Sequence, residues 1–164
     1  MTTLRETFVS DLKSIYDAEF QILEAFETMI RTAEHAELKR ALRRHLPQTR
    51  QHIERLKKLF DLFESSPERH LCKGMQGLIK ESMEILHSGS DAELILAAQK
   101  VEHYEIAVYG SLAAWARHLG HEPAADVLEE TLAEEKSADA TLTAIAESSV
   151  NADENQEASK EHND

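Results

Sequence analysis

Apolar side chains recur at the 3.6-residue spacing of an α-helix in four long segments of this chain. Plotted at about 100° per residue, one face is apolar over roughly residues 3–33, 35–64, 90–119 and 122–149. Aromatic residues make up only 5% of the chain, so runs of the residues that favour strands are nearly absent. Four such helices bury their apolar faces most simply against one another. The sequence therefore predicts an all-α fold.

The segment between the second and third predicted helices decides how the bundle is connected. About 25 residues lie between these two helices, too many for a hairpin loop, and turn signals occur at both ends of the stretch, at Ser66-Pro67 and Ser88-Gly89-Ser90-Asp91. Apolar residues recur there at helical spacing, namely Leu71, Met75, Leu78, Ile79, Met83 and Leu86. We therefore predict a ferritin-like four-helix bundle, made of two helix hairpins joined by a long crossover that contains a short fifth helix.

Length and composition set the domain limits and exclude several classes of protein. With 164 residues the chain can build one sizeable core, so we predict a single domain over residues 1–150. Residues 151–164 contain no apolar cluster and many acids, which predicts a disordered acidic tail. The net charge of −13 argues against nucleic-acid binding. No leader or membrane-spanning run is visible and the single cysteine, Cys72, has no partner, so we expect a cytoplasmic protein without membrane contact.

Polar side chains interrupt the apolar face of every predicted bundle helix near its middle. In chain order these side chains are Glu19, then His45, Gln48 and His52, then Glu105, and finally Glu135 and Asp139. Buried carboxylates without a partner are costly, so four helices that each place polar groups at similar depth need a compensating charge. Divalent cations provide it in the di-iron and di-manganese bundles. We predict a site for two Fe or Mn ions per chain.

The spacing departs from the Glu-x-x-His motif that two helices of such bundles carry. The second predicted helix has His45-x-x-Gln48, and the fourth has Glu135-x-x-x-Asp139 and no histidine. A weak internal repeat aligns Gln48 with Glu135. Because glutamine is neutral and a poor metal ligand, Gln48 leaves the predicted site one bridging charge short.

Residues beside the predicted ligands are assigned to supporting or exposed positions. We expect Glu102 and Tyr109 to contact the ligands rather than the metal. The second predicted helix carries basic residues on its solvent-facing side, where an acidic protein partner could bind: Lys39, Arg40, Arg43, Arg44, Arg50, Arg55, Lys57 and Lys58. The acids Glu129, Glu130 and Glu134 are also expected in solvent. Apolar residues outside the main faces, Val9, Leu23, Ile95 and Ile106, suggest a homodimer surface.

Three stretches of the chain resemble a known family. They are AAQKVEHYEIAVYGSL (97–112), LEETLAEEKSADATL (128–142) and HIERL (52–56), and the likeness covers about residues 4–150. They resemble the bacterial YciE/YciF-like stress proteins, a ferritin-like family. The resemblance implies a dimeric bundle, induced in stress responses, with a di-iron or di-manganese site akin to those of rubrerythrin and manganese catalase. This chain departs from the family pattern at Gln48, where the family has Glu, and at Pro47.

Two functions remain open at the level of sequence. In the first, Glu19, His45, Glu105 and Glu135 bind two Fe or Mn ions, with Gln48, His52 and Asp139 as further candidate ligands, and the site reacts with O2 or hydrogen peroxide. In the second, the metal site has been lost and the protein is a non-enzymatic dimeric stress or interaction module. The metal content of the protein distinguishes the two.

Overall fold

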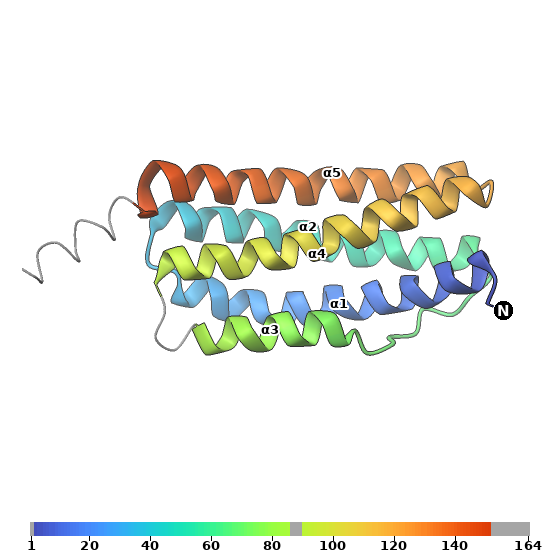
Figure 1. Cartoon of the computed structure of the whole chain (residues 1–164), viewed down its shortest axis with the longest axis horizontal. Coiled ribbons are helices and arrows are strands. Elements are labelled where there is room, and N and C mark those ends of the chain that lie inside the picture. Colours follow the sequence, from blue (N-terminus) through green and yellow to red (C-terminus); the bar gives the residue numbers. More distant parts are fainter. Residues whose placement is uncertain (1, 86–89, 152–164) are drawn as a thin grey trace, which may run out of the picture.

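The computed structural model describes residues 2–85 and 90–151 (Figure 1). Its elements are α1 (Leu4–Thr32), α2 (Ala36–Leu62), α3 (Lys73–Ile85), α4 (Asp91–His118), α5 (Glu122–Ile145) and a π-helical turn, η1 (Ala146–Val150). No strand occurs in the described ranges, and the prediction of an all-α chain is confirmed. The predicted tail, from residue 152 onward, and Leu86 lie outside the described residues, so the domain limit at residue 150 stays a prediction.

Helices α1, α2, α4 and α5 form the four-helix bundle, and α3 lies outside it. The α1–α2 and α4–α5 hairpins pack together through α2 against α5 and α1 against α4. The long crossover between the hairpins contains α3, which packs against α1 and α4 (Figure 1). The predicted ferritin-like arrangement of two hairpins and a short fifth helix is therefore confirmed. Within the described residues, no helix is both long and apolar enough to cross a membrane.

The turn between α4 and α5 follows directly from its sequence. Gly120 adopts a φ of 79°, a left-handed conformation that glycine reaches without steric cost. The N–H of His121 donates to the carbonyl of Ala116, and the N–H of Gly120 to that of Arg117. This is the hydrogen-bonding pattern of a Schellman motif, which satisfies the last carbonyls of a helix. Pro123 in the first turn of α5 then starts the next helix, which runs back along α4.

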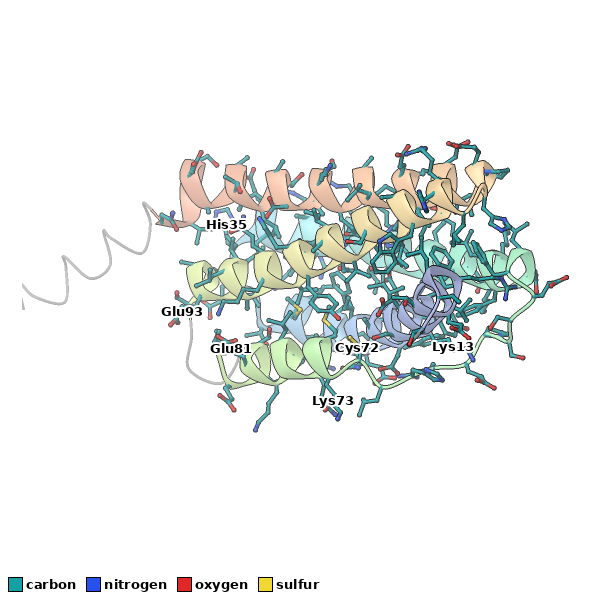
Figure 2. All side chains as sticks on the ribbon, turned by 45° about the vertical axis from the view of Figure 1, so that its right-hand side comes forward. Lys13, His35, Cys72, Lys73, Glu81 and Glu93 are labelled. Carbon is teal, nitrogen blue, oxygen red and sulfur yellow. The ribbon has the colours of Figure 1, made fainter. Side chains whose placement is uncertain are left out.

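The crossover is fixed to α1 by one buried carboxylate. Asp17 accepts hydrogen bonds from the backbone N–H of Cys72 at 2.8 Å and from Nε of Arg69 at 2.9 Å. Burial opposes ionisation, but these hydrogen bonds and the one from Gln21 lower the pKa of Asp17. The Cys72 thiol, at the start of α3 (Figure 2), lies 3.0 Å from the Tyr104 hydroxyl on α4. The crossover therefore has a defined path over the bundle.

Two details of the sequence patterns can be compared with the structure. Pro47 lies inside α2, which continues from Ala36 to Leu62, in keeping with the helix predicted over residues 35–64. Proline has no N–H to donate within the helix, and its exposed position leaves the unpaired carbonyl of Arg43 to water. Ile95, expected on a dimer surface, is buried in the core of this chain. Val9 and Leu23 pack against that core but stay partly exposed, so a dimer surface that includes them stays a prediction.

A pair of glycines in α3 tests how the crossover helix packs. A Cβ on Gly74 would lie 2.8 Å from Cε2 of Tyr104, whose hydroxyl is held against Cys72, whereas a Cβ on Gly77 meets no atom within 4 Å. We expect Gly74→Ala to lower the free energy of unfolding by about 1–3 kcal/mol through overpacking. Gly77→Ala should raise it by about 0.5–1 kcal/mol through helix propensity. Urea denaturation measures both, and equal effects would contradict this packing.

Candidate metal centre

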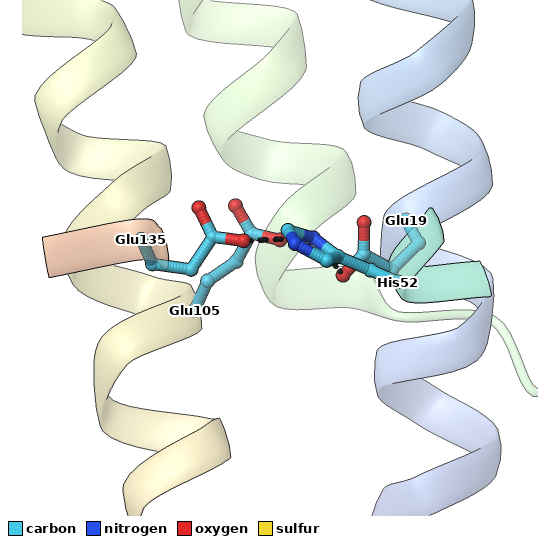
Figure 3. A group of neighbouring side chains, drawn as sticks. All are labelled: Glu19, His52, Glu105 and Glu135. Atoms are coloured by element: carbon cyan, nitrogen blue, oxygen red, sulfur yellow. Dashed lines mark ion pairs between the residues drawn. The ribbon is translucent and has the colours of Figure 1, made fainter. Parts of the chain in front are cut away.

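A cluster of acids and histidine lies at the centre of the bundle, and every bundle helix contributes to it. It comprises Glu19 from α1, His52 from α2, Glu105 from α4 and Glu135 from α5 (Figure 3). One ligand atom from each residue lies within 4.8 Å of all the others. None of the four side chains is more than 1% exposed. We call these four residues the enclosed group.

A second group lies beside the first and shares one residue with it. His45, Glu102 and Glu135 also place one ligand atom each within 4.8 Å of one another. Nε2 of His45 is 3.2 Å from Oε2 of Glu135 and 3.6 Å from Oε1 of Glu102. We call these three residues the second group. Glu135 contributes to both groups, so its carboxylate could contact an ion held by either one.

Several of these buried atoms have no hydrogen-bond partner among the described residues. They are Oε2 of Glu19, Oε2 of Glu102, both carboxylate oxygens of Glu135 and Nδ1 of His52. Oε1 of Glu135 is only 2.9 Å from Nδ1 of His52, so its orientation and not its distance prevents a hydrogen bond. Buried polar atoms are nearly always paired in native proteins. Atoms that converge without pairing fit a metal ion between them.

The carboxyl groups of the cluster differ in the direction in which their pKa values are shifted. Burial, followed by the charges of the neighbouring carboxylates, raises the pKa of Glu102 and Glu105 well above the ordinary value. Burial also opposes ionisation of Glu135, but His45 and His52 lower its pKa. Although burial disfavours a charged His52, Glu135 and Glu19 raise its pKa to about 11. Without metal, protons on histidines and carboxyl groups balance the charge, and a metal ion would replace them.

Each histidine is oriented by an acceptor on the side away from the cluster. Nε2 of His52 lies 2.7 Å from Oε2 of Glu134, and Nδ1 of His45 lies 3.1 Å from Oε1 of Gln48. If these nitrogens carry the protons, Nδ1 of His52 and Nε2 of His45 are free to bind metal. Ligating histidines are typically held in this way, and the partner fixes both ring orientation and tautomer.

Glu134 is itself held by a buried arginine. Nη1 of Arg55 donates to Oε2 of Glu134 at 2.6 Å and to the hydroxyl of Thr131 at 3.3 Å. Arg55 and His52 therefore share one carboxylate oxygen, and together they lower the pKa of Glu134 against the effect of burial. This Arg55–Glu134–His52 chain connects the bundle surface to the enclosed group.

Tyr109 supports the cluster from α4. Its buried hydroxyl donates to Oε1 of Glu19. Burial and the charges of Glu19 and Glu105 raise the pKa of Tyr109 well above the ordinary value, so the hydroxyl keeps its proton and stays a donor. Tyr109 thus positions the Glu19 carboxylate, as the sequence predicted, while Oε2 of that carboxylate stays unpaired.

Comparison with known proteins identifies the family. The sequence model of a family described as a domain of unknown function, DUF892, matches residues 3–155. The chain belongs to this family. The protein YciF of Escherichia coli is 41% identical over 157 residues, which cover 92% of this chain and 95% of that protein. The resemblance to the YciE/YciF-like proteins is thereby confirmed.

Solved structures of related proteins share the bundle. The crystal structure of YciF, described as a stress protein of E. coli, matches with a TM-score of 0.88 at 41% identity and covers 92% of this chain and 99% of that one. YcfI from Rhodopseudomonas palustris, described as a proposed structural protein, matches with a TM-score of 0.84 at 39% identity, covering 87% and 94%. A Xanthomonas campestris protein at 24% identity and a TM-score of 0.77, covering 94% and 99%, shares the fold.

The structure brings most of the predicted ligands together, but not all. Glu19, His52, Glu105 and Glu135 form the enclosed group, and His45 joins the second group. Asp139 belongs to neither, because Oδ1 accepts a hydrogen bond from Nε2 of Gln99 at 3.0 Å. Oε1 of Gln48 contacts Nδ1 of His45, and its role as a ligand stays a prediction. Glu102, expected beside the ligands, lies in the second group.

Two residues of the site were missed because they were assigned to solvent. Arg55 is only 8% exposed, and Glu134 contacts both Arg55 and His52. The expectation of an exposed Arg55 and a solvent-facing Glu134 was therefore wrong. Arg55 follows His52 by three residues, which places it about 60° away on the helix. Glu102 and Glu105 are separated by the same angle. A polar residue three positions from a predicted ligand was therefore the signal in the sequence that Arg55 could lie beside the site.

Removing Arg55 should cost stability because it leaves Glu134 partly buried and short of a donor. We expect Arg55→Met to lower the free energy of unfolding by about 1–3 kcal/mol in metal-free protein. Arg50→Met is the matched control, since Arg50 is exposed and has no ion pair with any described residue, and it should stay within about 0.5 kcal/mol. Urea denaturation of the two variants and the wild type decides. Equal losses would show that the Arg55–Glu134–His52 chain contributes nothing.

Proposed function

We propose that this DUF892 protein binds two Fe or Mn ions per chain and reacts with O2 or hydrogen peroxide in a bacterial stress response. Glu19, His52 and Glu105 would hold one ion, His45 and Glu102 the other, and Glu135 would bridge them. The shared position of Glu135 carries the proposal. It makes two ligand groups into one dinuclear site.

The ligand inventory supports a functional site and not a decayed one. Four carboxylates and two histidines are the inventory of the ferritin-like di-iron bundles. Here Glu102 provides the fourth carboxylate, and α2 provides both histidines, His45 and His52. The four negative charges equal the positive charge of two divalent ions. With Glu102 as the fourth carboxylate, a neutral Gln48 leaves the charge of the proposed site balanced.

The protein's own part in the reaction is to fix and enclose the ligands. When bound, Fe or Mn would supply the redox chemistry that no side chain here provides. The bundle core excludes water from Glu19, Glu105 and Glu135, which strengthens every charge interaction among them. Glu134 and Gln48 hold the two histidines in the tautomers that leave the inward nitrogens free.

A second candidate function is a non-enzymatic module in which the cluster is purely structural. The description of YcfI as a proposed structural protein favours it. In that case the contacts of His45 and His52 with Glu135 would be the final state of the site. We further propose a cytoplasmic homodimer, which follows from the family resemblance and plays no part in the ligand argument.

Metal content separates the two functions. Protein loaded anaerobically with Mn(II) or Fe(II) should retain about two ions per chain by elemental mass spectrometry. Glu105→Gln removes a ligand of one position only, so about one ion should remain. Glu135→Gln removes the shared ligand and should weaken both positions by at least about 100-fold, more than the loss of a supporting residue costs.

Asp139→Asn is the control for this experiment. The structure keeps Asp139 on Gln99 and outside both ligand groups, so the variant should retain both ions. A wild-type content far below one ion per chain under both loadings would support the structural module. Loss of an ion in Asp139→Asn would instead show that the sequence prediction of Asp139 as a ligand was right.

Reactivity is tested on the same samples. When O2 or hydrogen peroxide is added to anaerobic Fe(II)-loaded protein, iron oxidation should be at least about tenfold faster than in Glu135→Gln, because the preorganised ligands favour the oxidised pair. Absorbance of Fe(III) in a stopped-flow instrument follows the reaction. Equal rates in the two proteins and in free Fe(II) would contradict an oxidoreductase, whatever the metal content.

A further inference from the structure

A cavity of about 390 Å³ lies between α2 and α5, beside the second group. Its walls include His45 and Glu102, so the cavity leads directly to that metal position. Glu19, His52 and Glu105 of the enclosed group do not line this cavity. A ligand in this cavity would therefore lie beside the second group and away from Glu19, His52 and Glu105.

The cavity offers hydrogen-bond donors that nothing in the described structure uses. Gln48 contacts Nδ1 of His45 through Oε1, which leaves its amide N–H groups with no partner among the described residues. Arg44 at the rim makes no ion pair within the described part of the chain. Oε2 of Glu102 is buried and unpaired on the same side. A ligand here needs acceptor atoms for Gln48 and Arg44 and a donor atom for a metal ion.

Part of the cavity wall is apolar. This part is formed by Ala41, Leu42, Ala138 and Leu142, while Glu134, Ser137 and Thr141 add polar groups. The volume is at the lower end of the range for small-molecule sites, about 300–1,000 Å³, and far exceeds what a diatomic oxidant needs. The apolar part of the wall and the volume left beside the polar groups fit a ligand that carries a short hydrocarbon chain. Ser137 and Thr141 continue the polar side at the α5 edge.

We propose that this cavity binds a small carboxylic acid whose carboxylate is held by Gln48 and Arg44 beside the second group, with its short hydrocarbon chain against the apolar wall. The inference rests on the proposed function, because a bound metal ion offsets the charges of Glu102 and Glu135. It adds the chemical class of an organic ligand and the side from which it enters. Glu134 does not oppose the carboxylate, since Arg55 and His52 neutralise it.

The test uses full-length protein loaded with Mn(II), with acetate, butyrate and hexanoate as probes. Enhanced NMR relaxation of the probe protons by Mn(II) reports binding close to the metal. Affinity should rise about two- to fourfold for each added methylene, as expected for burial of hydrocarbon. Arg44→Leu should weaken butyrate about three- to tenfold, whereas Arg43→Leu, exposed on the same helix and outside the cavity, should leave it unchanged.

A second variant probes the other end of the ligand. Ala138→Leu narrows the apolar wall and should weaken hexanoate by about tenfold while acetate binding changes little. Two results would overturn the inference and leave a site for small inorganic ligands. One is an affinity that does not change with the chain length of the acid. The other is that added azide, a small inorganic anion, displaces acetate but neither butyrate nor hexanoate. Mn(II) content is measured on every sample. If the wild type holds about two ions and neither variant changes probe binding, this inference alone is wrong. If the wild type holds no ions, the proposed function is wrong and this inference with it.

Discussion

The stability of this bundle depends on compensating the mutual repulsion among its buried carboxylates. Glu19, Glu105 and Glu135 lie within 4.8 Å of one another at the centre of the core, where water cannot screen them. The apolar faces of four helices pack around a cluster that would be unstable if every carboxyl group were charged. His45 and His52 offset part of that charge, and a raised pKa at Glu105 removes more of it as a bound proton. Divalent ions would do the same without protons.

The fold was predictable because it follows from periodicity and from turn chemistry. Each bundle helix in the structure begins and ends within a few residues of the predicted limits, since its apolar face has a 3.6-residue repeat and its ends carry turn signals such as Gly120. The crossover helix was predictable for the same reason. Its anchor was not, because the contact of Asp17 with Cys72 joins residues 55 positions apart and leaves no local pattern.

The site was predictable only as far as a single helix reveals it. A helical wheel identified Glu19, Glu105 and Glu135 as inward, but it could not show which neighbours converge across helices. Partners on other helices decided the rest. Gln99 holds Asp139 away from the cluster, and Arg55 turns inward because Glu134 on α5 faces it. An argument from one face at a time therefore did not reveal that Glu102 converges with His45 and Glu135, or that Asp139 contacts Gln99.

The position of Gln48 bears on whether the predicted site is one charge short. Glu102, one turn before Glu105 on α4, brings a fourth carboxylate to the two ligand groups. A carboxylate at position 48 would add a fifth negative charge, more than two divalent ions would balance. A neutral amide instead holds His45 through its oxygen and presents unused N–H groups to the cavity. Under the proposed function, a neutral Gln48 thus leaves the charge of the centre balanced and faces the cavity from which a ligand would enter.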